Sequence, residues 1–359
     1  MSEIHKYEIF AINIKRNDDK KIYKLKYQDL RNWRKEFENF KNNQKDSKEI
    51  SFFNASNDIM KNLKRITGIL EESCLDNYID NLIPYSFILW MEIELVNLYF
   101  SKDDEEYYLI HNPCLKDKAF KIPMVRGSAW KGALANAFKI LINEPLEKKQ
   151  DYKIREYIQS YARIFGMGSS EFKNFTEALS ELLKDKLEKS SIENMIKYLI
   201  FELGLRLKKE DIDNFIKDKE KLKNWIKKKI WGEFGKVSKE DIPFFLKTHK
   251  GRAVFYPTFF DKLSLEVIHP HDRKKRKGKN PIFFEVVPRG SKGIVQVIYI
   301  PFDGIELKKE ELEKQVEKDK EFIMLAFKKV SDIGIGAKSK LGWGRFEIKK
   351  EKLIINGVK

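Results

Sequence analysis

The chain has 359 residues, 42% of them hydrophobic, with 26 Phe, 14 Tyr and 6 Trp. This apolar content supports a packed core and excludes wholesale disorder, and the length allows one or two domains at roughly 100 to 200 residues each. Its 71 Lys and Arg against 55 Asp and Glu give a net charge of +16, which favours nucleic acid as a partner, although a generally Lys-rich composition explains the charge equally well.

Cysteine usage and hydropathy exclude several further classes. Only Cys74 and Cys114 occur, and they do not have the spacing of a disulfide framework or a zinc site. The apolar runs FILWM and IVQVIYI are too short for a membrane span, and the first residues, MSEIHKYEIF, lack an apolar signal core. We therefore expect a cytoplasmic protein with no membrane partner and no small-molecule cofactor.

The first half of the chain changes character three times. Residues 1–84 are highly charged and are expected to form an N-terminal extension. A core strand is predicted within SFILWMEIELVNLYF, residues 86–100. A helix over about 129–142 follows, with Ser128 as its N-cap and apolar residues at helical spacing. Residues 143–246 combine helical periodicity with dense charge, which predicts a helical insertion.

Strand patterns return after the insertion, in GRAVFYPTFFDKLSLEVIHP, PIFFEVV and GIVQVIYI. A long helix is predicted over about 308–330, and the strand WGRFEI follows it. Without the insertion, the order is strand, helix, strands, helix, strand. This order predicts an α+β domain of the ferredoxin-like, RNA-recognition-like kind, built from residues 85–142 and 247–359.

The segment GIGAKSKLGWGRFEI, residues 334–348, joins the predicted last helix and strand. Glycines allow positive φ angles and close backbone approach, and interspersed cations favour a phosphate guest. A plain turn is the alternative. A Walker A loop is excluded because the GKS or GKT ending is missing, and a Rossmann turn is excluded because it would follow a strand. The candidate RNA-binding residues here are Gly334, Gly336, Lys338, Lys340, Gly342, Gly344 and Arg345.

A second basic segment is HDRKKRKGKN, which begins at His271. It is interpreted as a loop that clamps RNA phosphates, with a solvated loop as the alternative. Its candidate RNA-binding residues are His271, Arg273, Lys274, Lys275, Arg276 and Lys277. The cluster His269, His271 and Asp272 lacks further ligands at suitable spacing, so no metal site is expected.

Three segments together resemble the RAMP superfamily, the RNA-recognition-like subunits of CRISPR effector complexes. These are HNPCLKDKAFKIPMVRGSAWKGALANAF, LEVIHPHDRKKRKGKNPIFFEVVPRGSKG and DIGIGAKSKLGWGRFEI. The second resembles a segment of the end-capping, sixth-named subunit of the Cmr complex. The resemblance implies a structural, RNA-binding role beside other RAMP subunits on guide RNA and target RNA in a type III complex. It adds a further set of candidate RNA-binding residues at the helix start, namely Arg126, Gly127, Ser128, Trp130 and Lys131.

One position departs from the resemblance. Target-cleaving subunits of type III complexes carry an aspartate before the Asn-Pro pair, where this chain has His111. Imidazole is a possible general base but a poor Mg²⁺ ligand, so a non-catalytic role is expected. The alternatives are an endoribonuclease that uses His111 or the pair Asp103 and Asp104, and a protein-interaction scaffold without RNA affinity.

Overall fold

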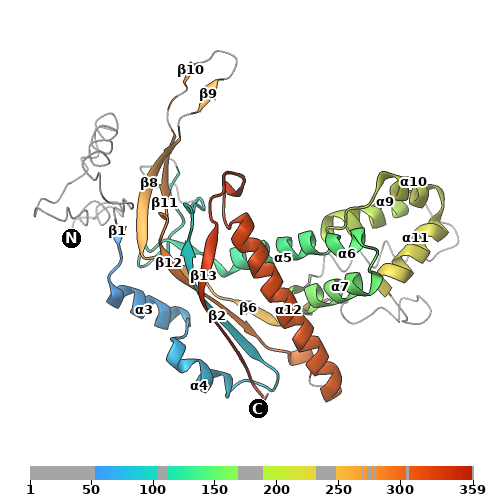
Figure 1. Ribbon diagram of the computed structural model, residues 1–359, viewed down its shortest axis with the longest axis horizontal. Helices are drawn as coiled ribbons and strands as arrows, with labels where there is room; N and C mark the ends of the chain where they lie inside the picture. Colours follow the sequence, from blue (N-terminus) through green and yellow to red (C-terminus); the bar gives the residue numbers. More distant parts are fainter. Residues whose placement is uncertain are drawn as a thin grey trace, which may run out of the picture.

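The computed structural model describes residues 53–103, 112–168, 189–231, 248–268, 270–272, 277–278, 280, 282–304 and 307–357. These residues form helices and antiparallel sheets, which confirms the α+β class. In Figure 1 a twisted sheet lies behind the long helix α12, a group of helices extends to the right, and a strand hairpin projects upward. The expected N-terminal extension lies mostly outside the described residues.

The central sheet has four strands in the order β13-β2-β12-β6, and all neighbours are antiparallel. The predicted strand at 86–100 is confirmed in a shorter form as β2. The last strand extends further than its pattern predicted, with a bulge after Ile348. The four strands are β2 (Phe87–Leu95), β6 (Ala253–Phe255), β12 (Lys292–Tyr299) and β13 (Phe346–Ile355).

Helices cover both faces of this sheet, which explains why β2 is a continuous apolar run at its start. Phe87 and Leu89 point into the main core beneath α5 (Gly127–Leu141) and α12 (Lys309–Ile333). Ile88 and Trp90 point the other way and pack with α4 (Leu75–Ile79). Alternation of buried and exposed residues begins only at Glu92, beyond the covered part of the strand.

Short helices precede the central sheet in the chain, and two small antiparallel ladders lie beside it. The helix α3 (Asn57–Thr67) is capped by Ser56, whose side chain accepts a hydrogen bond from the Ile59 amide. A 3₁₀ turn, η1 (Glu72–Cys74), leads into α4. The small ladders pair β3 (Met124–Val125) with β7 (Thr258–Phe259), and β4 (Gly166–Met167) with β5 (His249–Lys250).

The projecting hairpin belongs to a second sheet, in the order β1-β8-β11 (Figure 1). Its tip is a short ladder in which His271 lies opposite Gly278 and Asp272 opposite Lys277. The described residues at the two ends of the basic segment therefore pair with each other, and residues 273–276 lie outside the described ranges. The strands are β1 (Phe53–Asn54), β8 (Lys262–Ile268), β9 (His271–Asp272), β10 (Lys277–Gly278) and β11 (Ile282–Val286).

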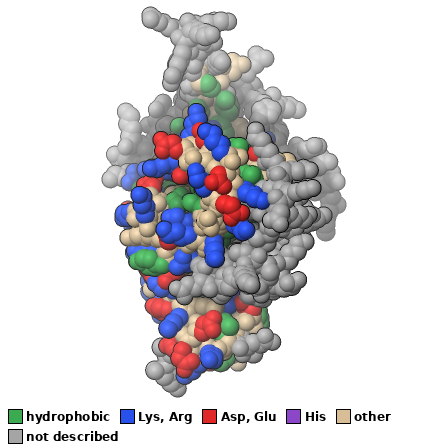
Figure 2. Space-filling view, turned by 90° about the vertical axis from the view of Figure 1, so that its right-hand side faces the viewer, with side chains coloured by type: hydrophobic (Ala, Val, Ile, Leu, Met, Phe, Trp, Pro, Cys, Tyr) green, Lys and Arg blue, Asp and Glu red, His purple; other side chains and the backbone are tan. Residues whose placement is uncertain are grey.

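The helices to the right in Figure 1 enclose a hydrophobic cluster of their own, which runs from Ile142 to Ile230 in the chain. Figure 2 shows Lys and Arg interspersed with Asp and Glu on the molecule's face at this end. The described members are α6 (Asn143–Glu147), α7 (Asp151–Phe165), α9 (Lys189–Lys197), the π-helix η2 (Tyr198–Glu202), α10 (Lys209–Lys217), α11 (Lys219–Ile226) and the π-helix η3 (Lys227–Trp231).

The helix α7 is shared between the two cores. Ile154 and Ile158 belong to the helical cluster, whereas Ile164 and Phe165 belong to the main core. The predicted insertion, 143–246, thus begins before a helix that contacts the sheet domain, and its boundaries stay a prediction.

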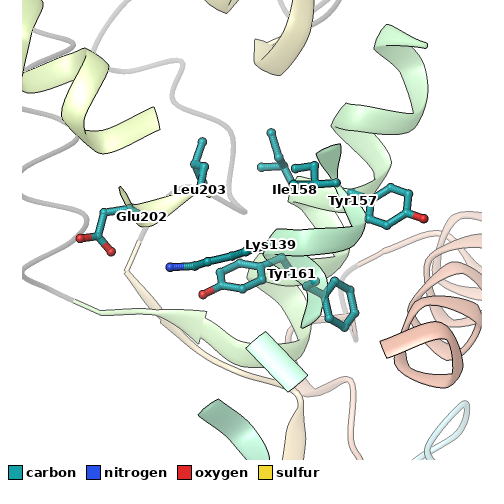
Figure 3. Close-up of a pocket in the computed structure, with 8 residues that line it drawn as sticks. Lys139, Tyr157, Ile158, Tyr161, Glu202 and Leu203 are labelled. Carbon is teal, nitrogen blue, oxygen red and sulfur yellow. The ribbon is translucent and has the colours of Figure 1, made fainter. Parts of the chain in front are cut away.

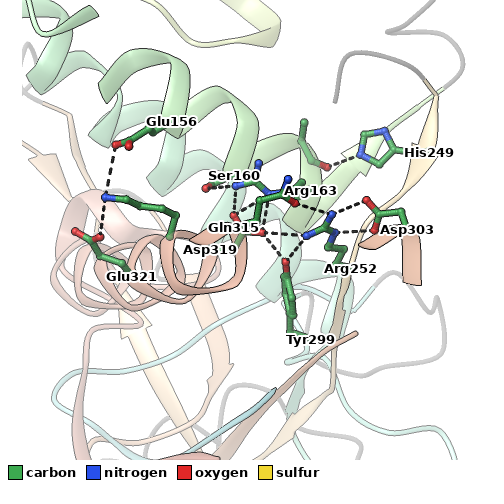
Figure 4. Close-up of polar contacts among 12 residues, drawn as sticks. Glu156, Ser160, Arg163, His249, Arg252, Tyr299, Asp303, Gln315, Asp319 and Glu321 are labelled. Atoms are coloured by element: carbon green, nitrogen blue, oxygen red, sulfur yellow. Dashed lines mark hydrogen bonds and ion pairs between the residues drawn. The ribbon is translucent and has the colours of Figure 1, made fainter. Parts of the chain in front are cut away.

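A buried polar network fixes α7 against α12 and the sheet (Figure 4). The Arg163 guanidinium donates to both Asp319 oxygens, and the Tyr299 hydroxyl donates to the same carboxylate at 2.6 Å. Arg252 donates to Tyr299 and, through two nitrogens, to Asp303. Burial and the neighbouring Asp319 charge raise the pKa of Tyr299 well above its ordinary value. In this network Tyr299 stays a neutral hydrogen-bond donor between the ion pairs Arg163–Asp319 and Arg252–Asp303.

Candidate functional site

The glycine segment, residues 334–345, connects α12 to β13 at the upper end of α12 in Figure 1, beside the β8–β11 hairpin. We call it the glycine loop. Its glycines all have positive φ, at 95° for Gly334, 87° for Gly336, 80° for Gly342 and 75° for Gly344. The expected need for positive φ is therefore confirmed at each of them.

The close approaches that these glycines allow are internal. A Cβ on Gly344 would lie 1.8 Å from the Ile335 carbonyl oxygen, and one on Gly334 would lie 2.2 Å from that of Trp343. A Cβ on Gly336 would lie 2.5 Å from the Phe100 carbonyl oxygen. These three glycines let the two arms of the loop cross each other and the chain after β2. The sequence had led us to expect that the close approach would serve a phosphate guest.

Several loop amides are also engaged within the protein. The Ile335 amide donates to Gly344 at 3.0 Å, the Ala337 amide to Phe100 at 2.8 Å, and the Gly344 amide to Leu98 at 2.6 Å. Because these amides already have acceptors, the loop is not an open nest of N–H groups. Side-chain cations must then provide most of its attraction for an anion.

The three cations of the loop have different surroundings. Lys340 and Arg345 are exposed. Lys338 is half-buried, and its ammonium nitrogen lies 4.5 Å from the centre of the Phe284 ring and 5.8 Å from that of Trp343. Of the three, Lys340 and Arg345 extend into solvent and Lys338 does not.

An aromatic cluster supports the loop from below. Phe100, Phe284 and Trp343 contact one another edge to face, with ring centres 5.2 to 6.4 Å apart. Trp343 is buried within this cluster. Its place is in the core of the loop.

The start of α5 is the second predicted contact region. Arg126, Ser128 and Lys131 are exposed there. The N-cap is Arg126, without a side-chain cap, and Ser128 lies inside the helix. The prediction that Ser128 caps the helix is therefore wrong. Extended backbone at Arg126 already ends the β3 strand, which moves the helix start two residues towards the N-terminus.

Two predicted contact residues at this helix start have internal roles instead. A Cβ on Gly127 would lie 2.1 Å from the Phe255 carbonyl oxygen, so this glycine lets α5 approach β6. Trp130 is fully buried, and its Nε1 donates to Thr258 Oγ1 at 2.9 Å. We therefore withdraw Trp130 as a surface contact, because burial in the main core prevents it from reaching RNA.

The helix start and the glycine loop meet over shared aromatic residues. Trp130 packs edge to face on Phe346, which directly follows Arg345, with ring centres 5.7 Å apart. Tyr99 donates its hydroxyl to the Met124 carbonyl, and a Cβ on Gly336 would lie 2.8 Å from its ring. The structure thus brings together two motifs that lie about 200 residues apart in the sequence.

The Asn-Pro segment is attached to β11. Asn112 donates its side-chain amide to the Phe283 carbonyl at 2.9 Å and accepts from the Glu285 amide at 3.0 Å through its own carbonyl. Glu285 forms a buried ion pair with Lys116 and accepts from the Cys114 amide. Burial raises the pKa of the Cys114 thiol to about 12.

The residues of the endoribonuclease alternative are only partly described. Asp103 is buried, and its amide donates to the Pro113 carbonyl at 3.0 Å. His111 and Asp104 lie outside the described residues. Within the described ranges, no group of three His, Cys, Asp or Glu side chains is placed to hold a metal ion.

A small hollow lies away from these motifs, between α5, α7 and η2 (Figure 3). Its walls are mainly apolar, and Lys139 at its edge donates to the Phe201 carbonyl at 3.0 Å. The hollow has room for about one water molecule. It is a packing gap between the helices.

Among the described residues, no helix is both long enough and apolar enough to cross a membrane.

Sequence reasoning missed the residues that hold the candidate site together. Tyr99, Phe284 and Glu285 have no distinctive spacing, and their roles depend on contacts between distant segments. The side chains of the basic hairpin tip, including the candidates His271 and Lys277, are outside the described residues.

Comparison with known proteins identifies a protein family that matches this chain. A sequence model described as the RAMP superfamily matches residues 110–347, from the Asn-Pro segment through the glycine loop. No curated protein matches the chain in sequence.

Solved structures give distant matches. One is described as "Cryo-EM structure of the Type III-B Cmr-beta bound to cognate target RNA"; it is 12% identical with a TM-score of 0.41, over 96% of this chain and 81% of the other. Another is described as "Crystal structure of Cmr6 from Pyrococcus furiosus"; it is 18% identical with a TM-score of 0.29, over 74% of this chain and 98% of the other.

Proposed function

The chain belongs to the RAMP superfamily, and we propose that it is a non-catalytic RNA-binding subunit of a type III CRISPR ribonucleoprotein of the Cmr kind. It holds guide RNA, and the duplex of guide and target, by the phosphate backbone, in the cytoplasm and in antiviral defence. Other RAMP subunits are its neighbours in the complex.

The observation that carries this proposal is the position of the exposed cations. Lys340 and Arg345 extend from the glycine loop, whose backbone is bonded to the chain after β2. Arg126, Ser128 and Lys131 are exposed at the start of α5, which shares the Trp130–Phe346 contact with the loop. Cations on a rigid support contact phosphates with little loss of side-chain and loop entropy.

The sheet supports the finer fold assignment. Along the chain its strands occur as β2, α5, β6, β12, α12 and β13, and in space as β13-β2-β12-β6. This order supports a split β-α-β arrangement, as in ferredoxin-like and RNA-recognition-like domains. We propose that residues 85–142 and 247–359 form this domain, that 143–246 are an insertion, and that 1–84 are an extension.

The salt dependence of RNA binding tests the proposal. The double variant Lys340→Ala/Arg345→Ala is expected to bind guide RNA more weakly and to reduce the slope of log K against log salt by about 0.7 per lost phosphate contact. The matched control is Lys217→Ala/Lys221→Ala, which removes two exposed charges from α10 and α11. Equal effects of both variants, or no RNA affinity in the unaltered chain, would contradict the proposal.

A cleavage assay tests the non-catalytic part separately. The purified chain and its reconstituted complex are incubated with labelled guide and target RNA, and we expect the RNA to stay intact. Cleavage that disappears in His111→Ala or in Asp103→Asn/Asp104→Asn would assign the endoribonuclease activity instead.

A further inference from the structure

We propose that Lys338 is a positioning residue: its ammonium group rests on the Phe284 and Trp343 rings of the aromatic cluster and so fixes the loop that presents Lys340 and Arg345. That the loop binds RNA rests on the proposed function. The positioning role itself is a property of the RNA-free protein.

The ammonium group of Lys338 is directed inward. It lies 4.5 Å from the Phe284 ring centre, within the range of a cation–π interaction, and 5.8 Å from the Trp343 ring centre. Both rings are buried, at 5% and 6% exposure. A cation over partly desolvated rings interacts more strongly than one on an open surface. Extending Lys338 towards a phosphate would give up both contacts.

The backbone at Lys338 is held in a turn. Its φ of 62° and ψ of 24° are left-handed, an uncommon conformation for a residue with a side chain. The 3₁₀ turn Ser339–Leu341 follows directly, and the Leu341 amide donates to the Lys338 carbonyl at 2.8 Å. The side chain that lies over the Phe284 ring thus starts from a backbone held in a turn.

This contact connects the loop to another part of the fold. Phe284 belongs to β11 and lies opposite Glu266 of β8, in the hairpin whose tip carries the basic segment. Phe100 follows β2 and accepts the Ala337 amide through its carbonyl. Lys338 therefore attaches the loop to the base of the hairpin, while hydrogen bonds attach it to the chain after β2.

Amide hydrogen exchange in the RNA-free full chain tests this role. The probes are the amides of Ala337 and Gly344, which donate to Phe100 and Leu98. In Lys338→Met, which keeps the length but removes the charge, we expect their exchange to be about fivefold faster. Lys338→Arg retains a cation for the rings and is expected to exchange as the unaltered chain does. The matched control, Lys340→Met, removes an exposed charge and is expected to leave both amides unchanged.

The partner ring provides a second variant. Phe284→Leu keeps Lys338 and an apolar side chain but removes the π face, so it is expected to accelerate the same two amides. Adding Lys338→Met to it should then accelerate exchange less than Lys338→Met does alone, because only the more distant contact with Trp343 is left to lose. Unchanged exchange in Lys338→Met, or equal acceleration in Lys340→Met, would overturn the inference.

RNA binding separates this inference from the proposed function. If the unaltered chain does not bind RNA but Lys338→Met accelerates exchange, the positioning role holds and the proposed function fails. If Lys340→Met weakens RNA binding but Lys338→Met leaves exchange unchanged, the function holds and the positioning role fails.

Discussion

The guanidinium of Arg163 on α7 pairs with the Asp319 carboxylate on α12 through both carboxylate oxygens, at 2.9 Å from Nε to Oδ2 and 2.6 Å from Nη2 to Oδ1. Both side chains are almost completely buried. Tyr299 donates its hydroxyl to the same carboxylate, and Ser160 accepts from the guanidinium. The pair therefore joins the helical cluster to the helix that covers the sheet.

Breaking this pair should destabilise the protein strongly. Asp319→Ala leaves the Arg163 charge buried without its carboxylate, so the free energy of unfolding should fall by about 3 to 5 kcal/mol. Urea denaturation of the variant and of the unaltered chain measures this loss of unfolding free energy. The control is Lys318→Ala, which removes partly exposed ion pairs with Glu156 on α7 and with Glu321 on α12 and should cost less than about 1 kcal/mol. Similar losses of unfolding free energy in the two variants would show that the buried pair stabilises the fold no more than the partly exposed one.

Gly344 and Gly342 should respond differently to the same substitution. Their φ angles are 75° and 80°, so alanine meets a similar backbone penalty, about 1 to 2 kcal/mol, at both. The new methyl group in Gly344→Ala would also lie 1.8 Å from the Ile335 carbonyl oxygen, whereas in Gly342→Ala the nearest neighbour is 3.4 Å away. We expect a clearly larger loss of unfolding free energy for Gly344→Ala. Equal losses would mean that the loop opens readily.

Trp130→Phe tests the reassignment of this tryptophan to the core. The variant loses the Nε1 donor to Thr258, which should reduce the free energy of unfolding by about 1 to 3 kcal/mol because an acceptor stays buried. RNA affinity, measured where the variant is fully folded, should be unchanged. A fall in affinity without a fall in stability would restore Trp130 as an RNA contact.

Stability should decline at alkaline pH through Cys114. Its folded-state pKa is about 12 against an ordinary 9.0, so the folded protein keeps the thiol proton to higher pH than the unfolded chain does. The resulting stabilisation is complete below about pH 9 and is lost as the pH rises from 9 towards 12. Unfolding free energies at pH 8 and pH 10 should differ by about 1.4 kcal/mol through this group alone. In Cys114→Ala that contribution should disappear.

The sequence by itself determined the features that depend on local pattern. Periodicity of two and of 3.6 residues located β2, α5, β11, β12 and α12, because the faces that each element buries recur along the chain. The positive φ of all four loop glycines was also expected, since few other residues adopt it at low cost. The resemblance to the RAMP superfamily rested on short motifs and agrees with the match over residues 110–347.

Only the tertiary structure decided what the motif residues contact. Trp130 and Gly127 look in sequence like parts of a binding surface, but neighbours from distant segments enclose them. Lys338 and Lys340 are two residues apart and chemically identical, yet one rests on Phe284 and the other is exposed. The physical reason is that burial and ring contacts are set by strand pairing across hundreds of residues, whereas sequence patterns report only each segment's own periodicity.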